Sequence, residues 1–169
     1  VSFKRLKGVT ILESAGTPRA LRSLWERLVN EKNWLVKIHI LYALAKHAYA
    51  PAVGDALDQF TKAPPTYYSA VGSILCTYGE PLVEYLDALL KEPPTICWKE
   101  LLFFALEIPR ESLYRYCLIL LDSDNPEAVK GAAEVLEKRY PYVLIEEKYV
   151  NHANTDVRAA SIRALGKEG

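Results

Sequence analysis

The sequence lacks several features that would mark a protein class at once. Its three cysteines show no paired C-x-x-C spacing, which favours small buried side chains in a reducing compartment over a disulfide framework. Apolar runs such as Leu101–Leu106 fall far short of the roughly 20 residues that cross a bilayer. The 21 basic and 21 acidic residues cancel. This balance argues against binding by phosphate neutralisation, although a local basic stripe could be concealed in the total.

Methionine is also missing, and no secretory signal pattern is visible. Because the chain starts at Val1 without any methionine, we expect it to be a piece of a longer protein. The cysteine usage favours a cytoplasmic location, while parts of the parent protein outside this segment could carry a membrane anchor or a catalytic domain.

No motif for catalysis or cofactor binding is present: the sequence has no G-x-S-x-G, G-x-x-x-x-G-K-[ST], G-x-G-x-x-G or H-E-x-x-H. His39 and His47 could share a helix face but have no third metal ligand, so hydrogen-bonded packing roles are expected. Glu100 and Glu107 are expected at the solvent edge of an apolar helix. We therefore predict no catalytic residues, no metal and no cofactor.

Prolines supply the strongest positive signal. The sequence has ten, and five of them are separated by 33, 30, 28 and 32 residues: Pro18, Pro51, Pro81, Pro109 and Pro141. Proline is tolerated in the first turn of a helix and disrupts its interior. Each of these five opens a segment with apolar residues at helical spacing, so a two-helix unit of about 30 residues repeats along the chain.

The two helices of each unit can be aligned between repeats. In the first unit Thr17 is the expected N-cap, Pro18 opens helix A, and an apolar stripe follows. The second helices, B, align on leucines at regular intervals: Leu44, Leu75, Leu106, Leu136 and Leu165. The expected units are 1–16 (a partial unit), 17–49, 50–79, 80–108, 109–139 and 140–169. Short connections make the two helices of a unit antiparallel neighbours, and apolar B helices must be buried by adjacent units.

Residues 154–166, Asn-Thr-Asp-Val-Arg-Ala-Ala-Ser-Ile-Arg-Ala-Leu-Gly, resemble the second helix of a HEAT repeat. Residues 124–136 and 33–44 resemble it less closely. The short period is similar to that of short bacterial HEAT-like repeats, including those of phycobilin lyases. Tetratricopeptide repeats, the nearest alternative, have positions that do not recur here. The resemblance implies an all-α fold, a right-handed α-α superhelix of about five two-helix repeats plus an N-terminal helix, in one domain spanning 1–169.

A basic residue follows the first apolar position of most B helices. We call this set the basic ladder: Lys37, Lys99, Lys130 and Arg158. In HEAT repeats the Val-Arg pair implies a core valine and an arginine along the edge of the stack, with Asp124, Glu127 and Asp156 as candidate partners here. Such exposed pairs contribute only about 0–1 kcal/mol each. The alternative is that the ladder lines a concave face and receives acidic groups of a partner.

Aromatic residues crowd the B helices. Most are expected in the core between repeats, but four are candidates for a partner-binding groove: Trp34, Tyr42, Tyr68 and Trp98. Tyr68 stands where other repeats carry the basic residue, so it is the strongest candidate. The expected function is a non-enzymatic scaffold that binds another protein or a peptide through its concave face. The alternatives are an enzyme subunit such as a bilin lyase, which needs a polar cluster, and a nucleic-acid-binding array, which the neutral charge disfavours.

Both ends of the array are expected to expose apolar helix surface, because neither shows a polar capping helix. We therefore expect the protein to continue beyond at least one end, or the ends to pair in an oligomer. No membrane contact by this segment and no nucleic-acid partner are expected.

Overall fold

The computed structural model describes residues 2–90 and 98–166, and within these ranges the chain is helical and has no strand. Helix makes up 81% of the described part, as the repeat pattern predicts. The chain divides into two compact units, residues 1–89 and residues 90–169. We describe each unit by itself.

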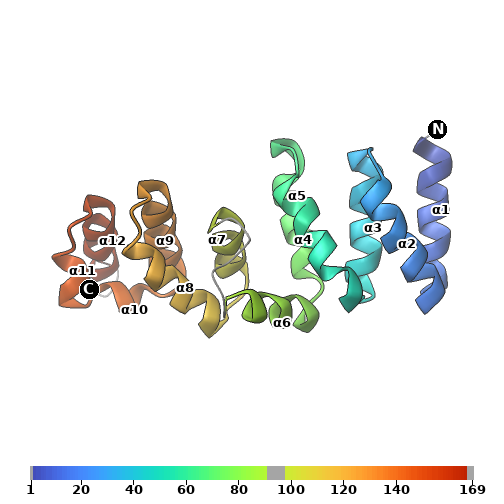
Figure 1. Ribbon diagram of the computed structural model, residues 1–169. Helices are drawn as coiled ribbons and strands as arrows, with labels where there is room; N and C mark the ends of the chain where they lie inside the picture. The colour runs from blue at the N-terminus through green and yellow to red at the C-terminus, as the bar shows by residue number, and fades with distance from the viewer. Residues whose placement is uncertain (1, 91–97, 167–169) are drawn as a thin grey trace. The chain divides into compact units, whose positions relative to one another are not determined.

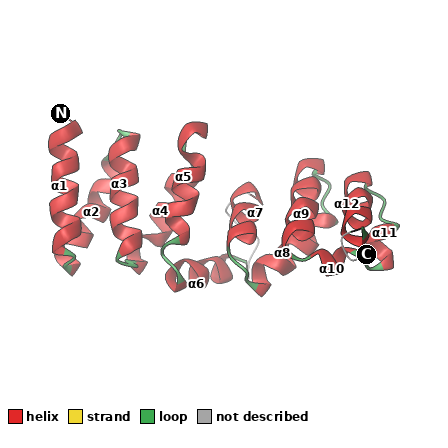
Figure 2. Ribbon diagram, turned by 180° about the vertical axis from the view of Figure 1, so that it is seen from behind, coloured by secondary structure: helices red, strands yellow, loops and turns green. Residues whose placement is uncertain are grey.

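Unit 1 begins with the single helix α1, continues with two helical hairpins, α2–α3 and α4–α5, and ends with α6 (Figure 1). Its elements are α1 (Ser2–Ala15), α2 (Pro18–Asn30), α3 (Trp34–Lys46), the 3₁₀ helix η1 (Ala50–Ala52), α4 (Val53–Thr61), α5 (Pro65–Cys76) and α6 (Glu80–Leu89). The B helix α3 packs against α1 on one side and α5 on the other, and α2 packs against both α1 and α3. Figure 2 shows α1, α3 and α5 side by side, with α2 and α4 behind them.

Unit 2 repeats this arrangement of B helices. Its elements are α7 (Trp98–Glu107), α8 (Glu111–Leu121), α9 (Pro126–Arg139), α10 (Pro141–Leu144), α11 (Glu147–Val150) and α12 (Thr155–Leu165). Helix α9 packs against α7 and α12, and also against α8 and α10. The fifth A segment, which has the least regular apolar pattern, is broken into α10 and α11. The start of the third B helix, with Cys97, lies outside the described residues.

The core of each unit lies where the B helices meet. In α3 the buried side chains cover more than one face: Val36, Ile40, Leu41, Ala43, Leu44 and Ala45. In α9 they are Ala128, Val129, Ala132, Ala133, Val135 and Leu136. Fully burying one large aliphatic side chain contributes about 1.5–3 kcal/mol, so a middle B helix loses most of its stability without neighbours on both sides.

The five periodic prolines lie at or near helix starts. Pro18 and Pro141 occupy the first helical position, Pro81 occupies the second position of α6, and Pro51 lies in η1 just before α4. The Thr17 hydroxyl accepts a hydrogen bond from the Ala20 N–H as expected. Pro109 differs, because α8 begins only at Glu111. The structural reason is that Pro109 lies in a turn, where the Arg110 N–H donates to the Ile108 carbonyl oxygen.

Asparagine is the N-cap of three B helices. Asn33, Asn125 and Asn154 each accept hydrogen bonds at the side-chain oxygen from backbone N–H groups of the first helical turn. These contacts satisfy donors that have no partner within the helix. The amide position in the HEAT-like segment 154–166 therefore has a local physical role, which is to begin α12.

A cap substitution tests this role. We expect Asn154→Ala to lower the free energy of unfolding by about 1 kcal/mol, because the Asp156 N–H loses its acceptor. The matched control is Asn151→Ala, an exposed asparagine at the end of α11. Urea unfolding followed by circular dichroism measures both changes. Equal losses in the two variants would contradict the capping role.

Candidate functional site

Two of the four candidate aromatic residues are held at the same end of unit 1. Trp34 begins α3, and its ring stacks on that of Tyr67 in α5 with 6.2 Å between centroids and 18° between planes. The next residue, Tyr68, packs its ring on Phe60 of α4 at 4.4 Å. Both rings of this second pair belong to the α4–α5 hairpin, so Tyr68 is half-buried within its own repeat.

Tyr42 is not part of this group. It lies two turns further along α3, its side chain is 45% exposed, and Lys46 Nζ lies 6.0 Å from its ring centroid. A separation of eight helical residues is about 12 Å along the axis. A single groove formed by all the candidate aromatic residues is therefore not present in unit 1.

Lys37, the first member of the basic ladder, joins the stacked rings to the core. Its Nζ lies 4.7 Å from the centroid of the Trp34 ring and donates a hydrogen bond to Oε1 of the buried Gln59. Burial, followed by the positive charge of Lys62, lowers the pKa of Lys37, and Asp58 opposes the shift. We call Trp34, Lys37, Gln59 and Tyr67 the aromatic edge.

A buried carboxylate lies beside the aromatic edge. Glu31, in the α2–α3 loop, is 6% exposed and accepts hydrogen bonds from Arg5 Nη1 (2.7 Å) and Arg27 Nη2 (3.3 Å). It also accepts from the backbone N–H groups of Lys32 (3.0 Å) and Asn33 (2.9 Å). Burial alone would raise the pKa of Glu31, but these hydrogen bonds and the two arginine charges outweigh it and lower the pKa.

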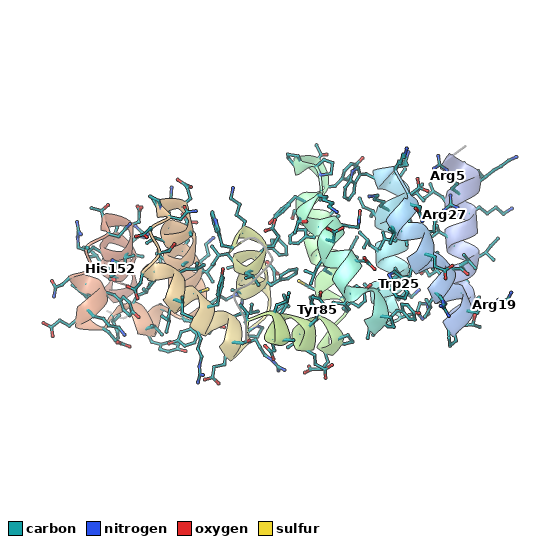
Figure 3. All side chains as sticks on the ribbon, viewed as in Figure 1. Arg5, Arg19, Trp25, Arg27, Tyr85 and His152 are labelled. Atoms are coloured by element: carbon teal, nitrogen blue, oxygen red, sulfur yellow. The ribbon has the colours of Figure 1, made fainter. Side chains whose placement is uncertain are left out.

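The same arginines line a surface pocket that sequence analysis missed. Its lining residues, which we call the arginine pocket, are Arg5, Arg27, Asn30, Glu31 and Lys32. Figure 3 shows Arg5 and Arg27 near the C-terminal end of α2, and Arg19 near the N-terminal end of the same helix. The pocket could not be found from spacing, because Arg5 and Glu31 are 26 residues apart.

The distribution of charge along the sequence is the signal that could have indicated this basic region. The first 50 residues contain nine lysines or arginines and three glutamates and no aspartate, a net charge of +6 with histidine neutral. The remaining residues carry −6, so the neutral total conceals a strong asymmetry. A local basic region, left open by the composition, is therefore present, and it falls on α1, α2 and α3.

The other ladder residues lie in unit 2 and do not have the expected acidic partners. Lys99 Nζ lies 5.4 Å from the ring centroid of Trp98, which is half-buried at the start of α7. Lys130 is exposed on α9. Arg158 donates to the carbonyl oxygens of His152 (2.7 Å) and Ala153 (2.8 Å), so it stabilises the loop before α12. Within the described ranges, no ion pair joins the ladder to the three acidic candidates, Asp124, Glu127 and Asp156.

Unit 2 also contains a tyrosine cluster that sequence analysis missed. The rings of Tyr114 and Tyr140 lie 5.0 Å apart, and Tyr142, 60% exposed, lies 6.4 Å from Tyr140. Helical spacing within one segment does not bring these tyrosines together, because Tyr114 lies in α8, Tyr142 in α10, and Tyr140 between α9 and α10. Burial, followed by the neighbouring Tyr142, raises the pKa of Tyr114.

The two histidines and two glutamates considered as chemical candidates differ from one another in exposure. His39 and His47 are both exposed, whereas hydrogen-bonded packing was expected. His47 Nε2 donates to the Glu13 carbonyl oxygen, which is the hydrogen-bonded part of that expectation. Glu100 is buried, contrary to expectation, while Glu107 is exposed. Within the described ranges, no three histidine, cysteine, aspartate or glutamate side chains come close enough to hold a metal ion.

No described helix has the length and apolar character needed to cross a membrane. Comparison with protein-family models, curated proteins and solved structures found no match to this chain. The resemblance to HEAT repeats therefore rests on the chain's own residues.

The role of Glu31 is testable through acid stability. We expect Glu31→Gln to lower the free energy of unfolding at pH 7 by about 1–3 kcal/mol, because charged hydrogen bonds are weakened. The folded pKa of Glu31 lies below its ordinary value of 4.5, so its stabilisation is present above pH 4.5 and is lost as pH falls through the folded pKa.

The difference between wild type and Glu31→Gln should therefore shrink below pH 4.5, as measured by urea unfolding between pH 3 and 7. Glu26→Gln is the control, since Glu26 forms only an exposed pair with Arg22. A difference that does not change with pH would show that Glu31 is not ionised in the folded protein.

Proposed function

We propose that this protein is a non-enzymatic adaptor built as a HEAT-like helical solenoid, a right-handed superhelix whose inner face holds another protein. The serial packing of B helices within each unit supports a solenoid, as does the HEAT-like segment 154–166. Fold alone supports no more than a binding role. The site that binds must therefore be argued from its own side chains.

The aromatic edge is the observation that carries the proposal. Trp34 and Tyr67 are stacked and half-buried, Lys37 contacts the ring of Trp34, and Leu35 next to Trp34 is 47% exposed. Rigid aromatic rings lose little conformational entropy when they bind, and they dominate protein-binding hot spots. This surface therefore has the properties of a docking site for an apolar segment of a partner.

Acidic residues flank this apolar segment of the partner. Lys32 and Lys37 lie within three residues of Trp34, and Lys37 contacts its ring. Opposite charge on a partner increases the association rate and excludes positively charged competitors. Binding should weaken with salt, because most of the cations of α1, α2 and α3 are exposed and screened at physiological ionic strength.

Nucleic acid is the second candidate partner, because the same +6 segment could attract phosphates and Trp34 could stack on a base. Asp58 favours the protein partner, since its carboxylate, close enough to Lys37 to affect the pKa of that lysine, would repel a phosphate backbone beside the aromatic edge. An enzyme subunit, such as a bilin lyase, would need a converging polar cluster, and no observation on the described residues favours one.

Affinity capture from cells that carry the gene tests the adaptor function. A tagged wild-type chain should retain a protein partner after nuclease treatment. We expect Trp34→Ala to reduce its recovery at least about tenfold, because truncating a central aromatic hot-spot residue costs about 2 kcal/mol or more. Leu35→Ala, which leaves the core intact, should reduce recovery in the same direction.

The control is Ile162→Ala, which removes a side chain that is 63% exposed on α12 of unit 2. Thermal unfolding followed by circular dichroism identifies any variant that fails to fold. Equal recovery with wild type, Trp34→Ala and Leu35→Ala would contradict the proposal. Loss of all bound protein after nuclease treatment would favour the nucleic-acid alternative.

A further inference from the structure

The arginine pocket brings three cations from separate elements around one carboxylate. Arg5 comes from α1, Arg27 from the last turn of α2, and Lys32 from the α2–α3 loop. The three positive charges of these side chains exceed the single negative charge of Glu31 by two. Lys32 makes no side-chain hydrogen bond or ion pair in the part of the chain that the structure describes.

Glu31 orients the two guanidinium groups without using all their donors. Arg5 donates to Glu31 through Nη1 and Arg27 through Nη2. The guanidinium group has five N–H donors in a rigid plane, so each arginine keeps further N–H groups for a ligand. The side chains of Arg5 and Arg27 are 33% and 45% exposed, so both can be reached from solvent.

Glu31 itself is a poor competitor for a bound anion. Two backbone N–H groups of its own loop hold the carboxylate, and its side chain is 2% exposed, so it cannot swing out of the pocket without breaking the loop. It neutralises one cation permanently. The macrodipoles of α2, which ends at this loop, and α3, which begins there, contribute opposite signs and offset each other.

The excess charge selects the class of ligand. A carboxylate would leave one positive charge unmatched, whereas a phosphate monoester carries about −1.5 to −2 at pH 7 and three acceptor oxygens. Paired arginines bind such a group through bidentate hydrogen bonds, and a nearby lysine adds a point charge. The pocket chemistry therefore fits a phosphate monoester better than an aspartate or glutamate side chain.

The surroundings of the pocket indicate the source of the phosphate. Trp34, which begins the aromatic edge, follows Lys32 by two residues, so a ligand can contact both sites at once. Resting on the proposed adaptor function, we infer that the arginine pocket binds a phosphoserine or phosphothreonine of the partner protein. An apolar side chain of the same segment then packs on Trp34 and Leu35, and phosphorylation controls when the partner is held.

A titration with small probes tests this inference on the full chain. The probes are N-acetyl-O-phosphoserine amide, N-acetyl-aspartate amide and inorganic phosphate, followed by NMR of the arginine Nε–H and lysine side-chain resonances. We expect saturable shifts of Arg5 and Arg27 with the phosphoserine derivative and with phosphate, and affinity at least about tenfold lower for the aspartate derivative.

Variants with the same change of charge distinguish binding in the arginine pocket from general electrostatic attraction to the basic surface. Arg27→Gln and Lys32→Gln should each weaken phosphoserine binding at least about fivefold, whereas Arg19→Gln, the same charge change at the other end of α2, should leave it unchanged. Lys32→Gln leaves every hydrogen bond of Glu31 in place, so it remains informative if an arginine variant fails to fold.

Three results would overturn the inference: equal weakening by Arg19→Gln, equal affinity for the aspartate derivative, or no saturation with the phosphoserine derivative.

A twelve-nucleotide oligothymidylate that binds at least as tightly as the phosphoserine derivative, and whose binding is lost with Arg27→Gln, would assign the pocket to nucleic-acid phosphate instead. Trp34→Ala should leave phosphoserine amide binding intact, so failure of the adaptor proposal and failure of this inference give different results.

Discussion

The structure depends on a simple constraint: the hairpin partner of an apolar B helix cannot by itself bury all of that helix's apolar faces. Helices α3 and α9 carry buried residues on several faces, so each needs a neighbouring B helix on both sides. Packing in series within each unit satisfies this requirement. It also leaves the first turns of α3 and α5, and the loops that precede them, at the surface of unit 1, where polar and aromatic side chains can be arranged without loss of core.

The α2–α3 loop connects this packing with the surface chemistry. Its buried Glu31 accepts hydrogen bonds from two helices and from its own backbone, so it joins α1 to α2 and orients Arg5 and Arg27. Two residues further on, Trp34 begins α3 and stacks on Tyr67. One short loop therefore determines both the arginine pocket and one side of the aromatic edge. The chain has no net charge yet presents a defined basic surface, because its first 50 residues carry +6 and the remainder −6.

Local sequence patterns predicted the positions of helices more successfully than they predicted contacts between distant residues. Thr17 and Pro18 correctly mark the start of α2, and the irregular pattern after Pro141 coincides with the break between α10 and α11. Contacts between distant residues were not predictable in this way. Tyr68 occupies the ladder position by alignment, yet its ring packs on Phe60, because the path of the α4–α5 hairpin decides what a ring can reach.

The sequence by itself determined the helical class, the period of about 30 residues and most helix starts, because proline, capping residues and apolar spacing act over one or two turns. Only the tertiary structure decided which side chains form sites. Arg5 and Glu31 are 26 residues apart in the sequence and are joined by a hydrogen bond, and the rings of Trp34 and Tyr67 stack although they belong to different hairpins. Both contacts depend on how the helices dock. Docking is set by the summed packing of many side chains and not by the spacing of any motif.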